Sequence, residues 1–137
     1  MANTQYDVFL SYSSKDRPWV AEFTAALREA GAQAWSVDEI MLGETWQEKV
    51  EEALRQSHVF VVLISSNNLA SPWMFFELGA AIADNKKIIP VLIEDVEMSQ
   101  VPSALKRLQI LRASSPTAAG KQVAEVIEKI SAKDISA

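Results

Sequence analysis

Short apolar runs alternate with amphipathic segments along almost the whole chain, and this alternation limits the possible folds more than any other feature. The runs are rich in β-branched and aromatic residues and have the length of buried strands. Between them, apolar residues recur at three- and four-residue spacing, as they do in helices that bury one face. A chain that alternates strand and helix in this way predicts a parallel sheet covered by helices on both faces. The five expected strands are residues 6–12, 32–37, 58–65, 87–93 and 107–113.

The expected fold class is a flavodoxin-like three-layer α/β fold whose five-stranded parallel sheet has the order 2-1-3-4-5. The chain has 137 residues, which suits one domain with one core, so we expect 1–137 to form a single domain with its core at about 6–132. Pro90 lies inside the fourth run although proline removes a ladder donor, and the more polar fifth run is expected at an edge of the sheet. Residues 94–106 are expected to be irregular, with one helical turn.

Several residues mark where the expected helices begin and end. Pro18 suits the first turn of the first helix, and Gly31 suits its end. Thr45 and Glu48 have the spacing of a capping box at the start of the second helix. Ser71, followed by proline, is expected to cap the helix after the third strand.

One acid, Glu77, interrupts the stretch SPWMFFELGAA (71–81), which otherwise has the composition of a core helix. In open parallel sheets, ligands bind beyond the carboxyl ends of the strands where the winding reverses, which here is between the first and third strands. The helix that carries Glu77 begins from the segment after the third strand. We therefore expect Glu77 to face a ligand cleft and, like a surface residue, to contribute little to stability.

The composition excludes several classes of site. A net charge of −5 gives no electrostatic reason to bind nucleic acid. The chain has no Cys and a single His, His58, so we expect no metal site and interpret His58 as structural. No stretch approaches the roughly 20 apolar residues that span a bilayer, and the start MANTQYDVF has no secretory pattern. We therefore expect a cytoplasmic domain that does not contact a membrane.

Two known kinds of site fit the expected cleft poorly. A phosphorelay receiver needs acids after the first strand and a phosphoacceptor Asp after the third, but Ser11, Tyr12, Ser65 and Ser66 occupy these positions. A flavin or nucleotide-phosphate site could use the hydroxyls and backbone donors of SYSSKD (11–16). This segment has no glycine, and the chain has neither a GxxxxGK[ST] nor a GxGxxG motif, so that signature is weak.

Three motifs in order resemble those of the Toll/interleukin-1 receptor (TIR) domain family. They are YDVFLSYSSKD, a Gly43–Trp46 pair before the second helix, and SPWMFFELGAA. The resemblance runs from about Tyr6 to Ile130, and it implies the same flavodoxin-like sheet. Some TIR domains are adaptors that act by self-association, and others cleave the nicotinamide–ribose bond of NAD+. The enzymatic members carry a Glu on the helix after the third strand and a Trp four residues earlier, which Trp73 and Glu77 match.

The resemblance implies an NAD+ glycohydrolase or cyclase that releases nicotinamide and ADP-ribose or a cyclic isomer, in bacterial immune signalling. NAD+ would be the substrate, and no cofactor is expected. Glu77 would be catalytic, and the substrate would contact Trp73, Tyr12, Ser13, Ser14 and Lys15. Several NAD-cleaving relatives have Arg in the loop that here contains two serines, which makes weaker or conditional activity more plausible. The alternative is a non-catalytic TIR interaction module that acts by homotypic self-association.

The resemblance also implies assembly through the loop before the second helix. In this chain the loop contains an apolar cluster that is costly to expose, Ile40, Met41 and Leu42, followed by Gly43. We therefore expect a homo-oligomer with other TIR domains, at least in the active state, and an activating partner protein or a missing domain is compatible with the tail. Asp38 and Glu39 resemble acids found after the second strand in the family, and we interpret them as solvated loop residues. Trp46 is expected to pack at the helix start.

Overall fold

The chain folds around one five-stranded parallel sheet. The computed structural model describes residues 6–35 and 46–136. Its strand order is β2-β1-β3-β4-β5, and every neighbouring pair is parallel, which confirms the expected topology. The two longest pairings are those of β1 with β3 and of β3 with β4, so these three strands form the centre of the sheet. The strands are β1 Tyr6–Ser11, β2 Ala34–Trp35, β3 Ser57–Ile64, β4 Lys87–Leu92 and β5 Leu111–Arg112.

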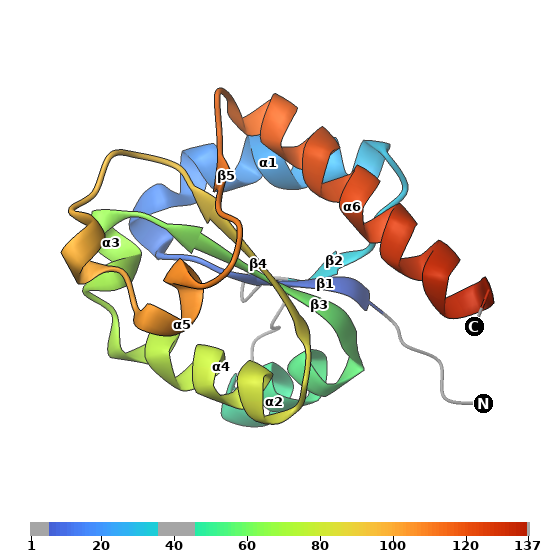
Figure 1. The fold of residues 1–137 in the computed structure, drawn as a ribbon, viewed down its shortest axis with the longest axis horizontal. Helices are drawn as coiled ribbons and strands as arrows, with labels where there is room; N and C mark the ends of the chain where they lie inside the picture. The colour runs from blue at the N-terminus through green and yellow to red at the C-terminus, as the bar shows by residue number, and fades with distance from the viewer. Residues whose placement is uncertain (1–5, 36–45, 137) are drawn as a thin grey trace.

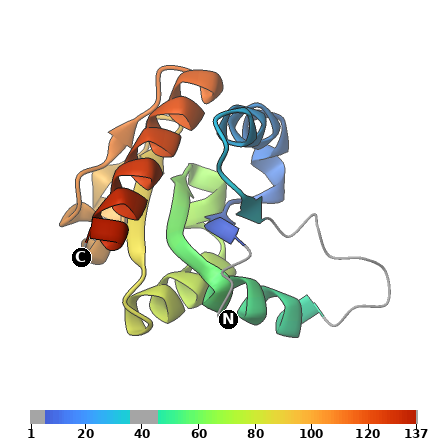
Figure 2. The same ribbon diagram turned by 90° about the vertical axis from the view of Figure 1, so that its right-hand side faces the viewer.

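Helices cover both faces of this sheet. Figure 1 shows α1 and α6 together on one face and α2 and α4 on the other, and Figure 2 shows α1 beside α6 in a second view. Short helices interrupt the loops that follow β1, β3 and β4. The bounds are η1 Ser14–Asp16, α1 Arg17–Glu29, α2 Trp46–Gln56, α3 Ser66–Leu69, α4 Pro72–Ala83, η3 Met98–Gln100, α5 Ser103–Lys106 and α6 Pro116–Ser136.

The side chains of β1 alternate between the two layers, as pleated strands require. Val8 and Leu10 belong to the core cluster under α1 and α6, whereas Phe9 belongs to the cluster under α2 and α4. Phe9 stacks between Trp35 and Phe60, with ring centroids 5.3 Å and 5.7 Å away. The same alternation directs the next odd residue, Ser11, toward the layer that contains α4.

Helices α1 and α6 approach each other closely because α6 has a glycine at the contact. A Cβ atom at Gly120 would lie 2.6 Å from Ala26 Cβ and 2.7 Å from the Phe23 carbonyl oxygen. Helix α1 begins with Pro18 in its first turn, and Gly31 follows its end with φ of 95°. The start and stop signals of this helix are thus confirmed.

Several details differ from the sequence-based expectations. Residues 66–69, which lie between the expected third strand and the helix expected to be capped by Ser71, form α3, because the Ser65 hydroxyl accepts from the Asn68 backbone N–H and caps a helical turn. Ser71 precedes α4, but its side chain makes no capping hydrogen bond. β4 is internal despite Pro90, and β5 pairs only with the two residues that follow this proline. The expected fifth strand is therefore present at the edge but shorter than 107–113.

Candidate functional site

Glu77 lies on the buried face of α4. The buried residues of this helix are Met74, Glu77, Leu78 and Ala81, which have the spacing of one helical face. Glu77 is only 6% exposed. Acidic side chains are rarely buried to this extent unless they have a partner. The expectation that Glu77 behaves like a surface residue is therefore wrong, because the helix turns this position toward the sheet.

Burial changes the acidity of Glu77. Desolvation raises the pKa of its carboxyl group from 4.5 to about 7, while hydrogen bonding from the side chains of Ser11 and Trp73 acts in the opposite direction. An indole N–H can only donate, so Trp73 favours the ionised carboxylate. The Trp73 ring also stacks on Phe76, with centroids 4.9 Å apart, which fixes its orientation. Glu77 therefore changes charge near neutral pH.

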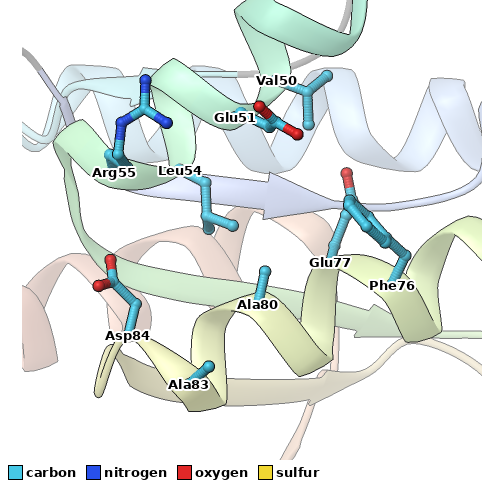
Figure 3. Close-up of a pocket in the computed structure, with 9 residues that line it drawn as sticks. All are labelled: Val50, Glu51, Leu54, Arg55, Phe76, Glu77, Ala80, Ala83 and Asp84. Atoms are coloured by element: carbon cyan, nitrogen blue, oxygen red, sulfur yellow. The ribbon is translucent and has the colours of Figure 1, made fainter.

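Glu77 also lines a cavity of about 360 Å³ between α2 and α4. Figure 3 shows its side chain reaching from α4 toward α2. The apolar part of the lining includes Leu54 and Ala80, and the charged part includes Glu51, Arg55 and Asp84. The cavity thus gives the acid an open side that is mostly apolar.

The loop after β1 does not contribute to this cavity. Tyr12 is half-buried and packs against the core cluster under α1 and α6, on the opposite face of the sheet from α4. The Ser13 hydroxyl accepts from the Lys15 backbone N–H at 3.2 Å and caps η1. Ser14 and Lys15 are exposed. The structure therefore joins Trp73 to Glu77, and the assignment of these four loop residues to substrate contacts stays a prediction.

Polar side chains tie this loop to the segment after β3. Asp16 accepts from the Ser65 hydroxyl at 2.5 Å and from the Asn67 amide at 3.0 Å. These two bonds join the carboxyl ends of β1 and β3, where the sheet reverses its winding. Protein groups thus occupy part of the position at which the topology predicts a ligand.

Sequence reasoning missed three residues of this region, Ser11, Asp16 and Asn68. Ser11 could have been found by parity, because it shares the alternation of Phe9 and must face the layer that holds Glu77. Asp16 and Asn68 lie in loops whose hydrogen bonds follow no simple spacing. No pattern in the sequence points to them as partners.

The remaining residues singled out in the sequence lie outside the described residues or away from the Glu77 cavity. The apolar cluster Ile40–Gly43 and the acids Asp38 and Glu39 lie outside the described residues, as does Thr45. Trp46 begins α2, and His58 is an exposed residue near the start of β3. Among the described residues, no three acidic or imidazole side chains come together as metal ligands, and no helix has the length and apolar character that a bilayer crossing requires.

The fold and the site define a flavodoxin-like domain with a buried acid on the helix after its third strand. Residues 8–127 match the family model described as the TIR domain. The chain belongs to the TIR domain family, which confirms the resemblance drawn from its three motifs.

Curated relatives include microbial enzymes. The chain is 30% identical over 102 residues to the probable 2' cyclic ADP-D-ribose synthase TcpO of Methanobrevibacter olleyae, over 68% of the chain and 30% of that protein. It is 27% identical over 115 residues to the 2' cyclic ADP-D-ribose synthase BtTIR of Bacteroides thetaiotaomicron, over 77% of the chain and 40% of that protein. The chain therefore spans less than half the length of these two relatives.

Solved structures support the fold. The TIR domain of the Toll-related receptor TRR-2 of Hydra magnipapillata has a TM-score of 0.70 at 24% identity, and the match covers 96% of this chain and 99% of that one. The heterodimer of the RPS4 and RRS1 TIR domains has a TM-score of 0.66 at 19% identity, with 90% and 96% covered. These likenesses concern the fold, and the second neighbour is a TIR domain in an assembly.

Proposed function

We propose that this TIR domain cleaves the bond between nicotinamide and ribose in NAD+, releasing nicotinamide with ADP-ribose or a cyclic ADP-ribose isomer. The observation that carries the proposal is Glu77, a buried carboxyl with a pKa near 7 that contacts Trp73 and lines a cavity. Relatives with cyclic ADP-ribose synthase names support the same substrate class. The cellular setting that we propose, bacterial immune signalling, rests on the motif resemblance alone.

Departure of nicotinamide from NAD+ needs little protonation by the protein. The nicotinamide ring of NAD+ is cationic, so when the C–N bond breaks it leaves as a neutral molecule with the bonding electron pair. The positive charge moves to the anomeric carbon and ring oxygen of the ribose, as in glycoside cleavage. Water that captures this carbon and loses a proton gives ADP-ribose, whereas a nucleophilic group of the same molecule gives a cyclic isomer.

The ionised form of Glu77 is suited to stabilise that ribose cation. A carboxylate in a mostly apolar cavity acts through a low local dielectric, so its attraction for a developing positive charge is stronger than in water. With a pKa near 7, the carboxyl of the free protein exists in both charge states around neutral pH. The cationic ring of bound NAD+ favours the ionised carboxylate further.

The direct test is nicotinamide release from NAD+ by the purified chain, compared with Glu77→Gln. We expect release by the wild type and a rate lower by about 10²–10³ in the variant, the usual effect of removing one well-placed electrostatic group. The assay includes high protein concentration and a crowding agent, because assembly is expected to favour activity. No release from the wild type under these conditions contradicts the proposal.

A second candidate, a non-catalytic self-association module, is favoured by the outer face of α4. Phe75 and Ile82, which are seven residues apart and so lie along one stripe of the helix, are each close to half exposed, as apolar side chains at contact surfaces often are. Self-association without nicotinamide release would identify this function instead.

A further inference from the structure

The hydroxyl group of Ser11 is buried beside Glu77 and has little else to bind. Ser11 is the last residue of β1, is 1% exposed, and faces the layer that contains α4. Among the described residues its Oγ atom has no partner at full hydrogen-bond geometry. The Glu77 carboxyl lies close enough for this hydroxyl to act on it, and the interaction lowers the pKa of that carboxyl against the larger effect of burial. Buried hydroxyls without a good partner are uncommon in folded proteins, which points to a role for this one.

The backbone of Ser11 is held in place by the side chain of Asn68. The Asn68 amide donates to the carbonyl oxygen of Ser11 at 3.3 Å and to that of Leu63 at 2.8 Å. Asn68 is itself 2% exposed and is fixed by a backbone bond to the Ser65 hydroxyl at 3.0 Å. It therefore bridges β1 and β3 just beyond the register pair Ser11–Val62. The hydroxyl of Ser11 is thus presented to Glu77 by a rigid frame.

We propose that Ser11 is a positioning residue for Glu77, whose hydroxyl, together with the Trp73 indole, orients the carboxylate toward the ribose of the substrate. This inference rests on the proposed NAD-cleaving function. Ser11 need not touch the substrate, since its hydroxyl acts on the orientation and charge of another side chain. Removing it leaves the carboxylate freer to rotate and less favoured in its ionised form.

Other charged groups near Glu77 also influence the pH at which its carboxyl titrates. Glu51 and Arg55 of α2 and Asp84 at the end of α4 line the same cavity, and Asp16 lies behind Ser65. None of these groups is altered in the variants below. A change in the titration of Glu77 therefore reports on the hydroxyl that is removed.

The test compares Ser11→Ala, Ser11→Thr and the matched control Ser57→Ala. Ser57 is also 1% exposed, but its hydroxyl donates to the Ala53 carbonyl at 2.7 Å. It lies at the start of β3, whereas Ser11 pairs with Val62 near the other end of that strand. For each protein we would measure kcat and KM for NAD+ against pH, the carboxyl titration of Glu77 by ¹³C NMR, and the thermal midpoint. The NMR titration needs no enzymatic activity.

Ser11→Ala should lower kcat with little change in KM and move the acid limb of the pH profile and the Glu77 titration upward by about 0.5–1 pH unit, the effect of one lost hydrogen bond. Its thermal midpoint at pH 5, where the folded Glu77 is protonated in both proteins, should stay near that of the wild type, because an apolar group replaces a poorly bonded hydroxyl. Ser11→Thr, which keeps the hydroxyl, should restore both pH effects. Ser57→Ala should move neither.

An unchanged titration and pH profile in Ser11→Ala would overturn the inference, as would a fall in midpoint with no effect on Glu77. If the wild type releases no nicotinamide while Ser11→Ala still moves the Glu77 titration, the proposed function fails and the coupling of Ser11 to Glu77 is supported. If the wild type cleaves NAD+ and Ser11→Ala behaves like the wild type, the function stands and the positioning role fails.

Discussion

At the scale of single residues, the ionisation of Glu77 links the site to the stability of the fold. The pKa of its carboxyl is 4.5 in an exposed reference and about 7 in the folded chain. Below about pH 4.5 both states hold the proton. Between 4.5 and 7 the unfolded chain loses the proton and the folded chain keeps it, so stability falls as the pH rises. Above 7 this loss is complete and constant.

Glu77→Gln should remove this pH dependence. The difference between 4.5 and about 7 corresponds to about 3 kcal/mol of unfolding free energy that the wild type loses across this range. The variant should therefore gain stability relative to the wild type when the pH is raised from 4 to 8. Denaturant unfolding of both proteins at the two pH values measures the change, and other groups cancel in the comparison. An equal difference at both pH values would contradict the burial of an ionisable Glu77.

Part of the candidate site could be predicted at this scale and part could not. The pair Trp73 and Glu77 was visible because a four-residue spacing on a helix brings two side chains together. The sequence does not show that Glu77 points toward the sheet, because α4 is apolar on most of its surface and no pattern singles out its core-facing side. Ser11 was overlooked for the opposite reason: an isolated serine at the end of a strand looks like part of the following turn.

At the scale of elements, the strands and their order were predictable because buried parallel strands are apolar throughout and few orders suit a doubly wound sheet. Helix α3 was not, because its only signal is the short capping contact of Ser65 with Asn68. In the sequence, Pro90 argues against an internal strand, because proline cannot donate to the ladder. It is tolerated because β5 pairs only with Val91 and Leu92, so no paired residue of β5 stands opposite the proline.

The contact of α1 with α6 gives a prediction for an element pair. Gly120→Ala should destabilise the fold by about 1–3 kcal/mol, because the added methyl group meets Ala26 and the Phe23 carbonyl at distances that force the helices apart. Gly79→Ala on α4 is the matched control, since open space surrounds that position. It should stabilise the helix by up to about 1 kcal/mol. Unfolding free energies of the two variants give the comparison, and equal effects would contradict the close packing at Gly120.

At the scale of the whole molecule, the chain has the TIR fold, and its expected self-association depends on residues at the surface of that fold. The match to the family covers residues 8–127, so the sheet and both helical layers are present. The apolar loop cluster Ile40–Gly43 lies outside the described residues, and its role in self-association stays a prediction. Phe75 and Ile82 of α4, each close to half exposed, are the apolar side chains of a second surface that could be tested in the same way.

Met41→Glu tests the expected assembly. A charge placed in the apolar loop should weaken self-association, and nicotinamide release should fall with it if active sites depend on assembly. Analytical ultracentrifugation at several concentrations, with the activity assay on the same samples, measures both quantities. Unchanged association and activity would show that this loop is not the interface.

The pH dependence of NAD+ cleavage tests the central claim, that a buried Glu77 acts as an ionised catalytic group. In the free enzyme kcat/KM should rise with pH through a midpoint near 7, because only the carboxylate stabilises the ribose cation. The midpoint of kcat should be lower, since bound NAD+ favours the charged form, and the residual activity of Glu77→Gln should lack this limb. A rate that is flat between pH 5 and 9, or a Glu77→Gln variant that retains near-normal kcat/KM, would contradict the account.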